Sequence, residues 1–325
     1  MIKSVSRAIA LGAALLVLPV SGAAAQSYPN KPIRLVVPYN PGGVVDYVGR
    51  TLAQYLSKPL GQSVVAENRP GAGGILGTDT VARSAPDGYS LVLMDPAIVI
   101  NPTLQESMPY DLFKNLEVIS IVSSSPLVLV VSPELPVKNF AELVAYGKAN
   151  PGKLNFASAG IGTTPHLSGE MFKQQTGADA THIPYKGIAL SYTDMMSGKI
   201  QFSFSSIAGA LPFTSDNRVR AIATTGAKRT TSVYPDLPTV AEAGLPGFEV
   251  DLWLGLFAPA GLPADVRNKL AGAIAEIMKD PTLKVALAKV GAEPRGTTPE
   301  EAAKVLRQEH DKWKKVITDG NIKSN

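Results

Sequence analysis

Short runs of aliphatic and β-branched residues alternate with segments of helical periodicity along the whole chain. The runs predicted as strands are residues 33–37, 63–66, 91–94, 127–131, 154–158, 181–184, 200–205, 219–224 and 250–257. Most of these runs are apolar at successive positions, as in strands that are buried on both faces. The alternation is typical of βαβ units and predicts an α/β protein with mostly parallel sheets.

Between the strands, apolar residues recur at the spacing of amphipathic helices. Two clear stripes are Val45, Val48, Leu52 and Leu56, and Val266, Leu270, Ile274 and Ile277. The last helix is predicted to begin after Thr298. Thr298 is its N-cap, Pro299 takes the first helical position, and Glu301 is placed to close a capping box.

The N-terminal 25 residues have the pattern of a cleaved signal peptide. Lys3 and Arg7 precede an apolar run that ends at Val20, and the alanines from Ala23 to Ala25 offer a cleavage site. The run is shorter than the ~20 residues that a membrane-spanning helix needs. We therefore expect export, cleavage after Ala25 and a periplasmic mature protein.

Composition and length narrow the classes of protein. The 325 residues include no cysteine, which excludes a disulfide framework and a thiolate metal site. Removing Lys3 and Arg7 from 31 basic residues leaves 29 against 27 acidic ones, so the net charge of +2 indicates no nucleic-acid partner. A chain of about 300 residues exceeds the usual size of one core, so two lobes are expected.

No linker composition separates the lobes, so the chain is expected to cross between them on extended segments. The candidate crossings are residues 126–136 and 250–263. On this division, residues 26–125 and 251–325 form lobe 1, and residues 126–250 form lobe 2.

The first candidate binding segment runs from Tyr39 to Asp46. It follows a predicted strand, contains Pro41, Gly42 and Gly43, and opens a predicted helix. A helix N-terminus presents unpaired N–H groups and a partial positive charge, so such a junction is suited to an anion. The same pattern also fits an ordinary tight turn.

The second candidate segment runs from Ser158 to His166 and has the same strand–glycine–helix order. Gly162 precedes Thr163 and Thr164, either of which fits as an N-cap. The hydroxyls of Ser158, Thr163 and Thr164 could donate hydrogen bonds to an anion, and His166 could add one if protonated. The alternative is a plain N-cap followed by an exposed histidine.

The sequence gives little support for nucleotide binding, hydrolytic catalysis or metal binding. A third glycine-rich segment, residues 69–77, lacks the spacing of a dinucleotide fingerprint. Ser158 stands on a strand-to-helix turn but lacks the first glycine of G-x-S-x-G, and His310 lies among charged residues of the last helix. The histidines have no partners at metal-ligand spacing. We expect no catalytic residue, no cofactor and no metal.

An ordered set of motifs resembles the Bug/TctC family, the extracytoplasmic solute receptors of tripartite tricarboxylate transporters. The matching segments are residues 28–34, 41–46, 67–74, 86–89, 109–111, 182–187, 238–242, 255–261 and 298–301. The resemblance implies a two-lobed periplasmic-binding-protein type II fold with a ligand cleft between the lobes. It also implies a monomer without enzyme activity that delivers a small carboxylate or dicarboxylate to a membrane permease. The alternative is a receptor that hands its liganded form to a signalling partner.

By position, the resemblance places ligand contacts in the same two loops, the second holding a carboxylate directly and the first partly through water. Two positions depart from the family pattern: Asp95 stands where a small residue is usual, and Ser205 where aspartate is frequent. If Asp95 lines the cleft, the ligand is expected to carry a hydroxyl, an amine or a neutral end nearby, unless Asp95 is protonated. The alternative is a surface residue that starts a turn with Pro96.

Overall fold

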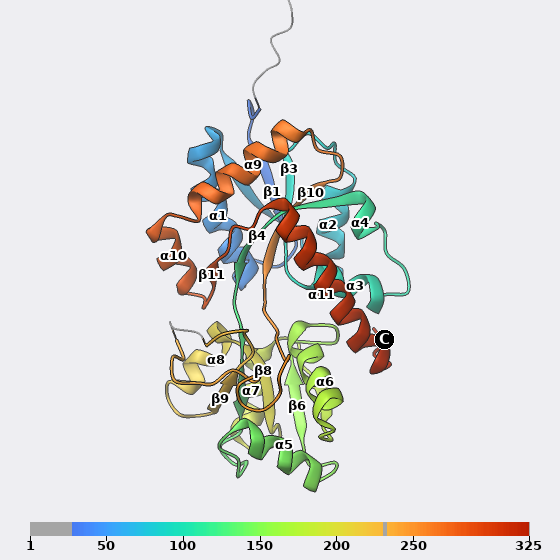
Figure 1. Ribbon diagram of the computed structural model, residues 1–325, viewed down its shortest axis with the longest axis vertical. Coiled ribbons are helices and arrows are strands. Elements are labelled where there is room, and N and C mark those ends of the chain that lie inside the picture. Colours follow the sequence, from blue (N-terminus) through green and yellow to red (C-terminus); the bar gives the residue numbers. More distant parts are fainter. Residues whose placement is uncertain (1–27, 230–232, 325) are drawn as a thin grey trace, which may run out of the picture.

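The computed structural model describes residues 28–229 and 233–324, which form two α/β lobes stacked along the long axis (Figure 1). One sheet has the strand order β11-β4-β10-β3-β1-β2, and the other β7-β6-β8-β5-β9. The predicted signal peptide lies outside the described residues. Within the described part of the chain, no helix combines the length and the hydropathy that crossing a membrane requires.

Lobe 1 is built on the six-stranded sheet. Its strands are β1 (Ile33–Val37), β2 (Val64–Asn68), β3 (Ser90–Met94), β4 (Leu116–Ser124), β10 (Leu254–Pro259) and β11 (Glu293–Pro294). Its helices are α1 (Val44–Leu60), η1 (Ala72–Gly74), α2 (Ile75–Ala82), α3 (Ala97–Leu104), α4 (Leu112–Asn115), α9 (Ala264–Ile277), α10 (Pro281–Ala288) and α11 (Pro299–Asp319). The two predicted apolar stripes are the buried faces of α1 and α9, which pack together in one core.

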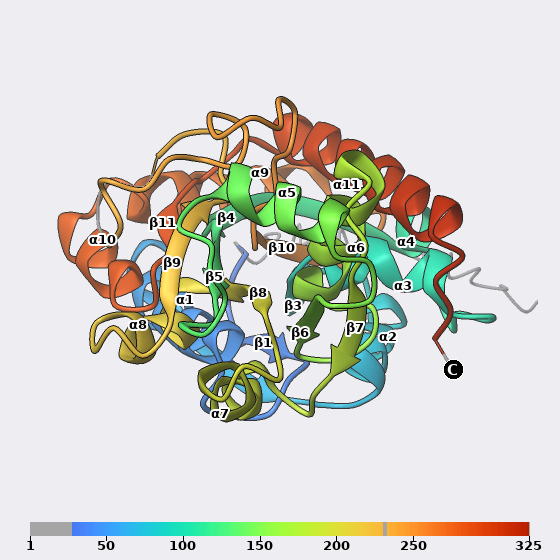
Figure 2. The ribbon, with the colours of Figure 1, turned by 90° about the horizontal axis from the view of Figure 1, so that it is seen from below.

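Lobe 2 is built on the five-stranded sheet. Its strands are β5 (Leu127–Val131), β6 (Asn155–Ser158), β7 (Thr181–Pro184), β8 (Phe202–Ser206) and β9 (Arg220–Thr224). Its helices are α5 (Phe140–Ala149), α6 (Thr164–Thr176), η2 (Ile188–Leu190), α7 (Ser191–Met196) and α8 (Ile207–Thr214). Figure 2 shows helices on both sides of these strands. Phe156, Phe172 and Phe202 pack ring against ring in the core.

The prediction of mostly parallel sheets is wrong, because both sheets are mixed. β1 pairs in parallel with β2 and β3, and β6 with β7 and β8, whereas β10 and β5 are antiparallel to their neighbours. The reason lies in the path of the chain. β5 and β10 each enter their lobe directly from the other one, so they begin at the edge where the parallel strands end.

The crossings between the lobes are shorter than predicted. β4, which the sequence pattern did not reveal, runs to Ser124, and β5 begins at Leu127. Much of residues 126–136 and 250–263 therefore lies within the strands themselves. The backbone N–H of Ser125 donates to the carbonyl of Leu252 at 3.2 Å, and that of Leu252 donates back at 2.8 Å. The two crossing segments thus form one hydrogen-bonded pair.

The C-terminal helix α11 contacts both lobes. Its predicted capping box is confirmed: Glu301 N donates to Thr298 Oγ1 at 3.2 Å, and Thr298 N donates to Glu301 Oε2 at 2.9 Å. The helix packs on β4 and α3 of lobe 1 and reaches α6 of lobe 2 (Figure 1). There Gln174 Nε2 donates to the carbonyl of Val316 at 2.9 Å.

Candidate functional site

A cavity of about 270 Å³ lies between the two lobes, beside the segments that join them. Its lining residues are Tyr39, Gly73, Asp95, Ala97, Asn101, Leu127, Ala159, Ile161, Gly162, Thr163, Thr164, Pro165, Ile188, Ser206 and Leu252. Because β1 and β3 are parallel, the residues that follow them meet at one sheet edge. The ends of β6 and β8 meet in the same way in lobe 2. The cavity therefore lies where open α/β sheets commonly bind ligands.

The start of α6 forms much of the lobe 2 wall. Of the two candidates, Thr163 is the N-cap, but its hydroxyl donates to the carbonyl of Gly160 at 2.8 Å and caps no N–H of the helix. The N–H groups of a first helical turn have no partner inside the helix. The hydroxyl of Thr164 makes no hydrogen bond to another described residue. This wall thus offers donors and the positive end of a helix dipole to the cavity.

The buried His166 and the half-buried His182 support this loop from behind. The N–H of Gly162 donates to His166 Nδ1 at 3.1 Å, and the His166 ring stacks on His182 with centroids 3.8 Å apart. Burial, followed by the charges of His182 and Lys173, lowers the pKa of His166 to about 3. His166 is therefore a neutral acceptor that shapes the loop, and it supplies no charge to the cavity.

Asp95 stands on the lobe 1 wall, one residue beyond β3. Its Oδ1 accepts hydrogen bonds from the Tyr39 hydroxyl at 2.7 Å and from the N–H of Ala97, at the start of α3, at 3.0 Å. Burial raises the pKa of Asp95, and the two hydrogen bonds oppose that rise. Of the described residues that line the cavity, Asp95 is the only acidic one, and none is lysine, arginine or histidine. The structure thus places Asp95 at the cavity between the lobes and not in an exposed turn.

The first loop is organised by an internal anion. The buried carboxylate of Asp46 accepts from Gly42 N at 2.9 Å, Arg50 Nε at 3.0 Å and Asn68 Nδ2 at 2.8 Å. Burial alone would raise the pKa of Asp46, but these hydrogen bonds lower it. Tyr39 is the member of this loop that lines the cavity. The other predicted residues of this loop, which do not line the cavity, are Pro41, Gly42, Gly43 and Asp46.

Ser158 and Ser205 lie fully buried behind the lobe 2 wall. Ser158 Oγ donates to the Gly160 carbonyl at 3.0 Å and lies 2.7 Å from His182 Nε2, while Ser205 Oγ accepts from the Tyr192 hydroxyl at 2.9 Å. The structure thus brings together five of the predicted residues at the cavity: Tyr39, Asp95, Gly162, Thr163 and Thr164.

Ala159, Ile161 and Pro165 lie within the predicted second segment but were not singled out, and the lining residues that lie outside both predicted segments are Gly73, Ala97, Asn101, Leu127, Ile188, Ser206 and Leu252. Ser206 had a usable signal, because it caps α8 by accepting from Gly209 N at 3.2 Å directly after a strand. Asn101 donates to the Gly73 carbonyl at 3.2 Å, which joins two segments that no local pattern connects.

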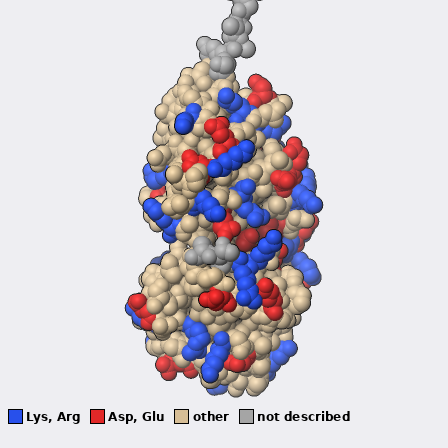
Figure 3. Space-filling model, turned by 60° about the vertical axis from the view of Figure 1, so that its left-hand side comes forward, with Lys and Arg blue, Asp and Glu red and all other residues tan. Residues whose placement is uncertain are grey.

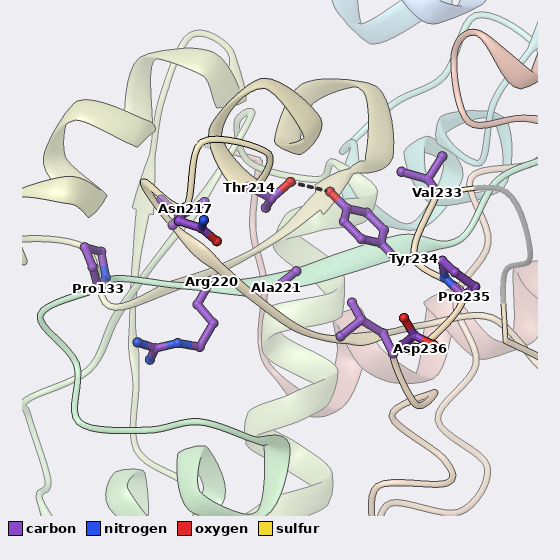
Figure 4. A pocket seen from close by; sticks show the side chains of 11 residues that line it. Pro133, Thr214, Asn217, Arg220, Ala221, Val233, Tyr234, Pro235 and Asp236 are labelled. Atoms are coloured by element: carbon purple, nitrogen blue, oxygen red, sulfur yellow. Dashed lines mark hydrogen bonds between the residues drawn. The ribbon is translucent and has the colours of Figure 1, made fainter.

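A second, larger pocket of about 430 Å³ lies beside β9 (Figure 4). Thr214, Arg220, Tyr234 and Asp236 are among its lining residues, and the Thr214 and Tyr234 hydroxyls lie 2.7 Å apart. All of its lining residues belong to lobe 2, so lobe 1 contributes nothing to this pocket. Charges of both signs are interspersed over the face in Figure 3. The cavity of about 270 Å³ is the candidate site because residues of both predicted loops line it.

Comparison with known proteins agrees with this geometry. The model of the tripartite tricarboxylate transporter family receptor matches residues 48–322. BugT of Bordetella pertussis is 35% identical over 317 residues, which cover 97% of this chain and 96% of BugT. A solved R. palustris protein with adipate is 33% identical, with a TM-score of 0.78 and coverage of 91% and 99%. MatC from Rhodopseudomonas palustris with bound malate is 29% identical, with a TM-score of 0.74 and coverage of 89% and 100%.

Proposed function

The chain belongs to the tripartite tricarboxylate transporter receptor family, and from this premise we propose that it captures a small carboxylate in the cavity between its lobes. The observation that carries the proposal is the uncapped start of α6, which faces the cavity with Thr164 as its first residue. A carboxylate there would accept from the free N–H groups and the Thr164 hydroxyl. An anion near a helix N-terminus gains ~0.3–1 kcal/mol, and up to ~2 kcal/mol where it is partly buried.

The remainder of the cavity suits a short carbon chain. Leu127, Ile188 and Leu252 give it apolar walls between the polar ends. Two of the solved relatives hold adipate and malate, which are dicarboxylates of six and four carbons. A carboxylate of this size range is therefore the ligand that we propose for this chain.

We further propose that the mature protein begins after Ala25, works in the periplasm as a monomer and delivers its ligand to a membrane permease. The family to which the chain belongs supports this role, as does the charge and apolar pattern of the first 25 residues. No enzyme activity is proposed. The permease would recognise the closed form, because ligand binding shifts the equilibrium towards the state that the ligand prefers.

Calorimetry on protein freed of ligand by unfolding and refolding tests the capture. Adipate, malate and shorter and longer acids are titrated beside their neutral diamides. We expect at least one acid to bind and no diamide to do so. Thr164→Ala should weaken binding, whereas Thr318→Ala, an exposed threonine of α11, should not. Absence of binding across the series, or equal binding of acids and diamides, would contradict the proposal.

A further inference from the structure

Helices α3 and α6 begin at opposite walls of the cavity, and they differ in whether a side chain of the protein accepts a hydrogen bond from their first N–H groups. α3 begins beside Asp95, whose Oδ1 accepts from Ala97 N, so its N-terminus has an anion of the protein itself. α6 begins at Thr164 and has no side chain as a cap, because Thr163 donates its hydroxyl to Gly160. A ligand carboxylate is thus favoured at the lobe 2 wall and repelled at the lobe 1 wall.

The far end of the ligand then faces the carboxylate of Asp95. The proton of the Tyr39 hydroxyl is already donated to Oδ1 at 2.7 Å, and Oδ2 receives no hydrogen bond from another described side chain. No lysine, arginine or histidine is among the described residues that line the cavity, so no cation of the protein offsets this charge. A second carboxylate there would lie against a like charge, whereas an ammonium or hydroxyl group would meet an acceptor.

We propose that Asp95 is a specificity residue that selects small carboxylates whose far end carries a hydrogen-bond donor, above all an ammonium group, over dicarboxylates. The proposal rests on the proposed function, since it assumes that a carboxylate occupies the start of α6. It assigns the ligand class as ω-amino or ω-hydroxy acids of a length that the cavity accommodates.

Ligands matched in length and differing at one end test the selection. Calorimetry compares 6-aminohexanoate, 6-hydroxyhexanoate and adipate, and then 4-aminobutyrate and succinate. For the unaltered protein we expect the amino acid to bind at least tenfold more tightly than the dicarboxylate of the same length. Tenfold corresponds to about 1.4 kcal/mol of binding free energy.

Asp95→Asn removes the charge and keeps an oxygen that can accept from Ala97 N. We expect it to lower the affinity for the amino acid at least tenfold and to raise the affinity for the dicarboxylate. Asp95→Ser, another residue suited to a helix start, should change the order in the same direction. Asp216→Asn, which removes an exposed carboxylate of lobe 2, should leave the order unchanged. Thermal melting shows whether each variant is folded.

Three results would overturn the proposal: the same ligand order in unaltered protein and Asp95→Asn, tighter binding of the dicarboxylate by the unaltered protein, or proton uptake with the dicarboxylate. Proton uptake, measured in two buffers of different ionisation enthalpy, would mean that Asp95 binds as the neutral acid. If neither the unaltered protein nor Asp95→Asn binds any of these acids, the proposed function itself fails. Binding without a change of order defeats the role of Asp95 alone.

Discussion

Replacing Gly162 with alanine should weaken ligand binding by holding the lobes apart. Gly162 lies in the loop before α6 with φ +77°, and a Cβ built there would come within 2.2 Å of Leu104 Cδ2. Leu104 ends α3 of lobe 1, whereas Gly162 belongs to lobe 2. The steric conflict therefore exists only when the lobes approach each other as they do in this structure.

The expected effect follows from separating two costs. The left-handed backbone conformation costs a residue other than glycine roughly 1–2 kcal/mol, which applies to the open and the closed form alike. The added methyl group overpacks the contact with Leu104, and overpacking typically costs ~1–3 kcal/mol. Only this second cost opposes closure. At about 1.4 kcal/mol per tenfold change, the dissociation constant should rise roughly 5- to 150-fold.

A double-mutant cycle measured by calorimetry checks this reasoning. Gly162→Ala, Leu104→Ala and the double variant are titrated with the best ligand of the carboxylate series. Because Leu104→Ala removes the atoms that conflict with the new methyl group, the double variant should recover much of the affinity. Gly152→Ala is the control for backbone strain, since Gly152 has φ +74° and no atom within 4 Å of its added Cβ. Unchanged affinity in Gly162→Ala, or a loss that Leu104→Ala does not restore, would refute the mechanism.

Three further predictions concern stability, measured by urea denaturation. Burial, followed by the charge of Glu249, raises the pKa of Asp251 to about 6. Asp251→Asn should therefore raise the free energy of unfolding by an amount that grows as pH rises from about 4 to 6 and reaches ~1–3 kcal/mol at pH 7.5. The pKa of His166 is lowered to about 3, so its effect on the pH dependence of stability has the opposite sign. Neutral His166 contributes stability above pH 6.5, and this contribution should be lost as pH falls towards 3. The same loss should be seen in the Asp251→Asn variant, in which Asp251 no longer titrates. Thr298→Ala removes the α11 cap and should cost about 1 kcal/mol, whereas Thr318→Ala should cost little.

The sequence predicts the local elements well, because they depend on residues that are close in the chain. The helix start at Thr298 and the N-cap at Thr163 are both set by their immediate neighbours. β4 escaped the pattern because it contains buried serines, among them Ser120, Ser123 and Ser124. The direction of the strands cannot be predicted from neighbouring residues, since it is set by where the chain crosses between the lobes.

The candidate site was predicted in part, for a related reason. A strand followed by glycine and a helix start is visible in the sequence, but the sequence does not show whether an internal group already occupies the N–H groups. In both loops a glycine N–H donates to a side chain four residues on, Gly42 to Asp46 and Gly162 to His166, and no side chain caps α1 or α6; only the tertiary fold places the start of α6 at the cavity. Asn101 and Ser206 come from different lobes, so only the tertiary fold brings them to one cavity.

On the proposed function, the position of the cavity ties ligand affinity to the movement of the lobes. Leu127 and Leu252, one beside each crossing segment, line the cavity, and Gly162 meets Leu104 across the lobe boundary. The helices α6 and α11 also meet across the lobe boundary, where Gln174 donates to the backbone carbonyl of Val316. The apparent affinity is the intrinsic affinity reduced by the fraction of protein in the binding-competent state. Residues that never touch the ligand therefore contribute to its affinity, because they set the free-energy difference between the open and closed forms.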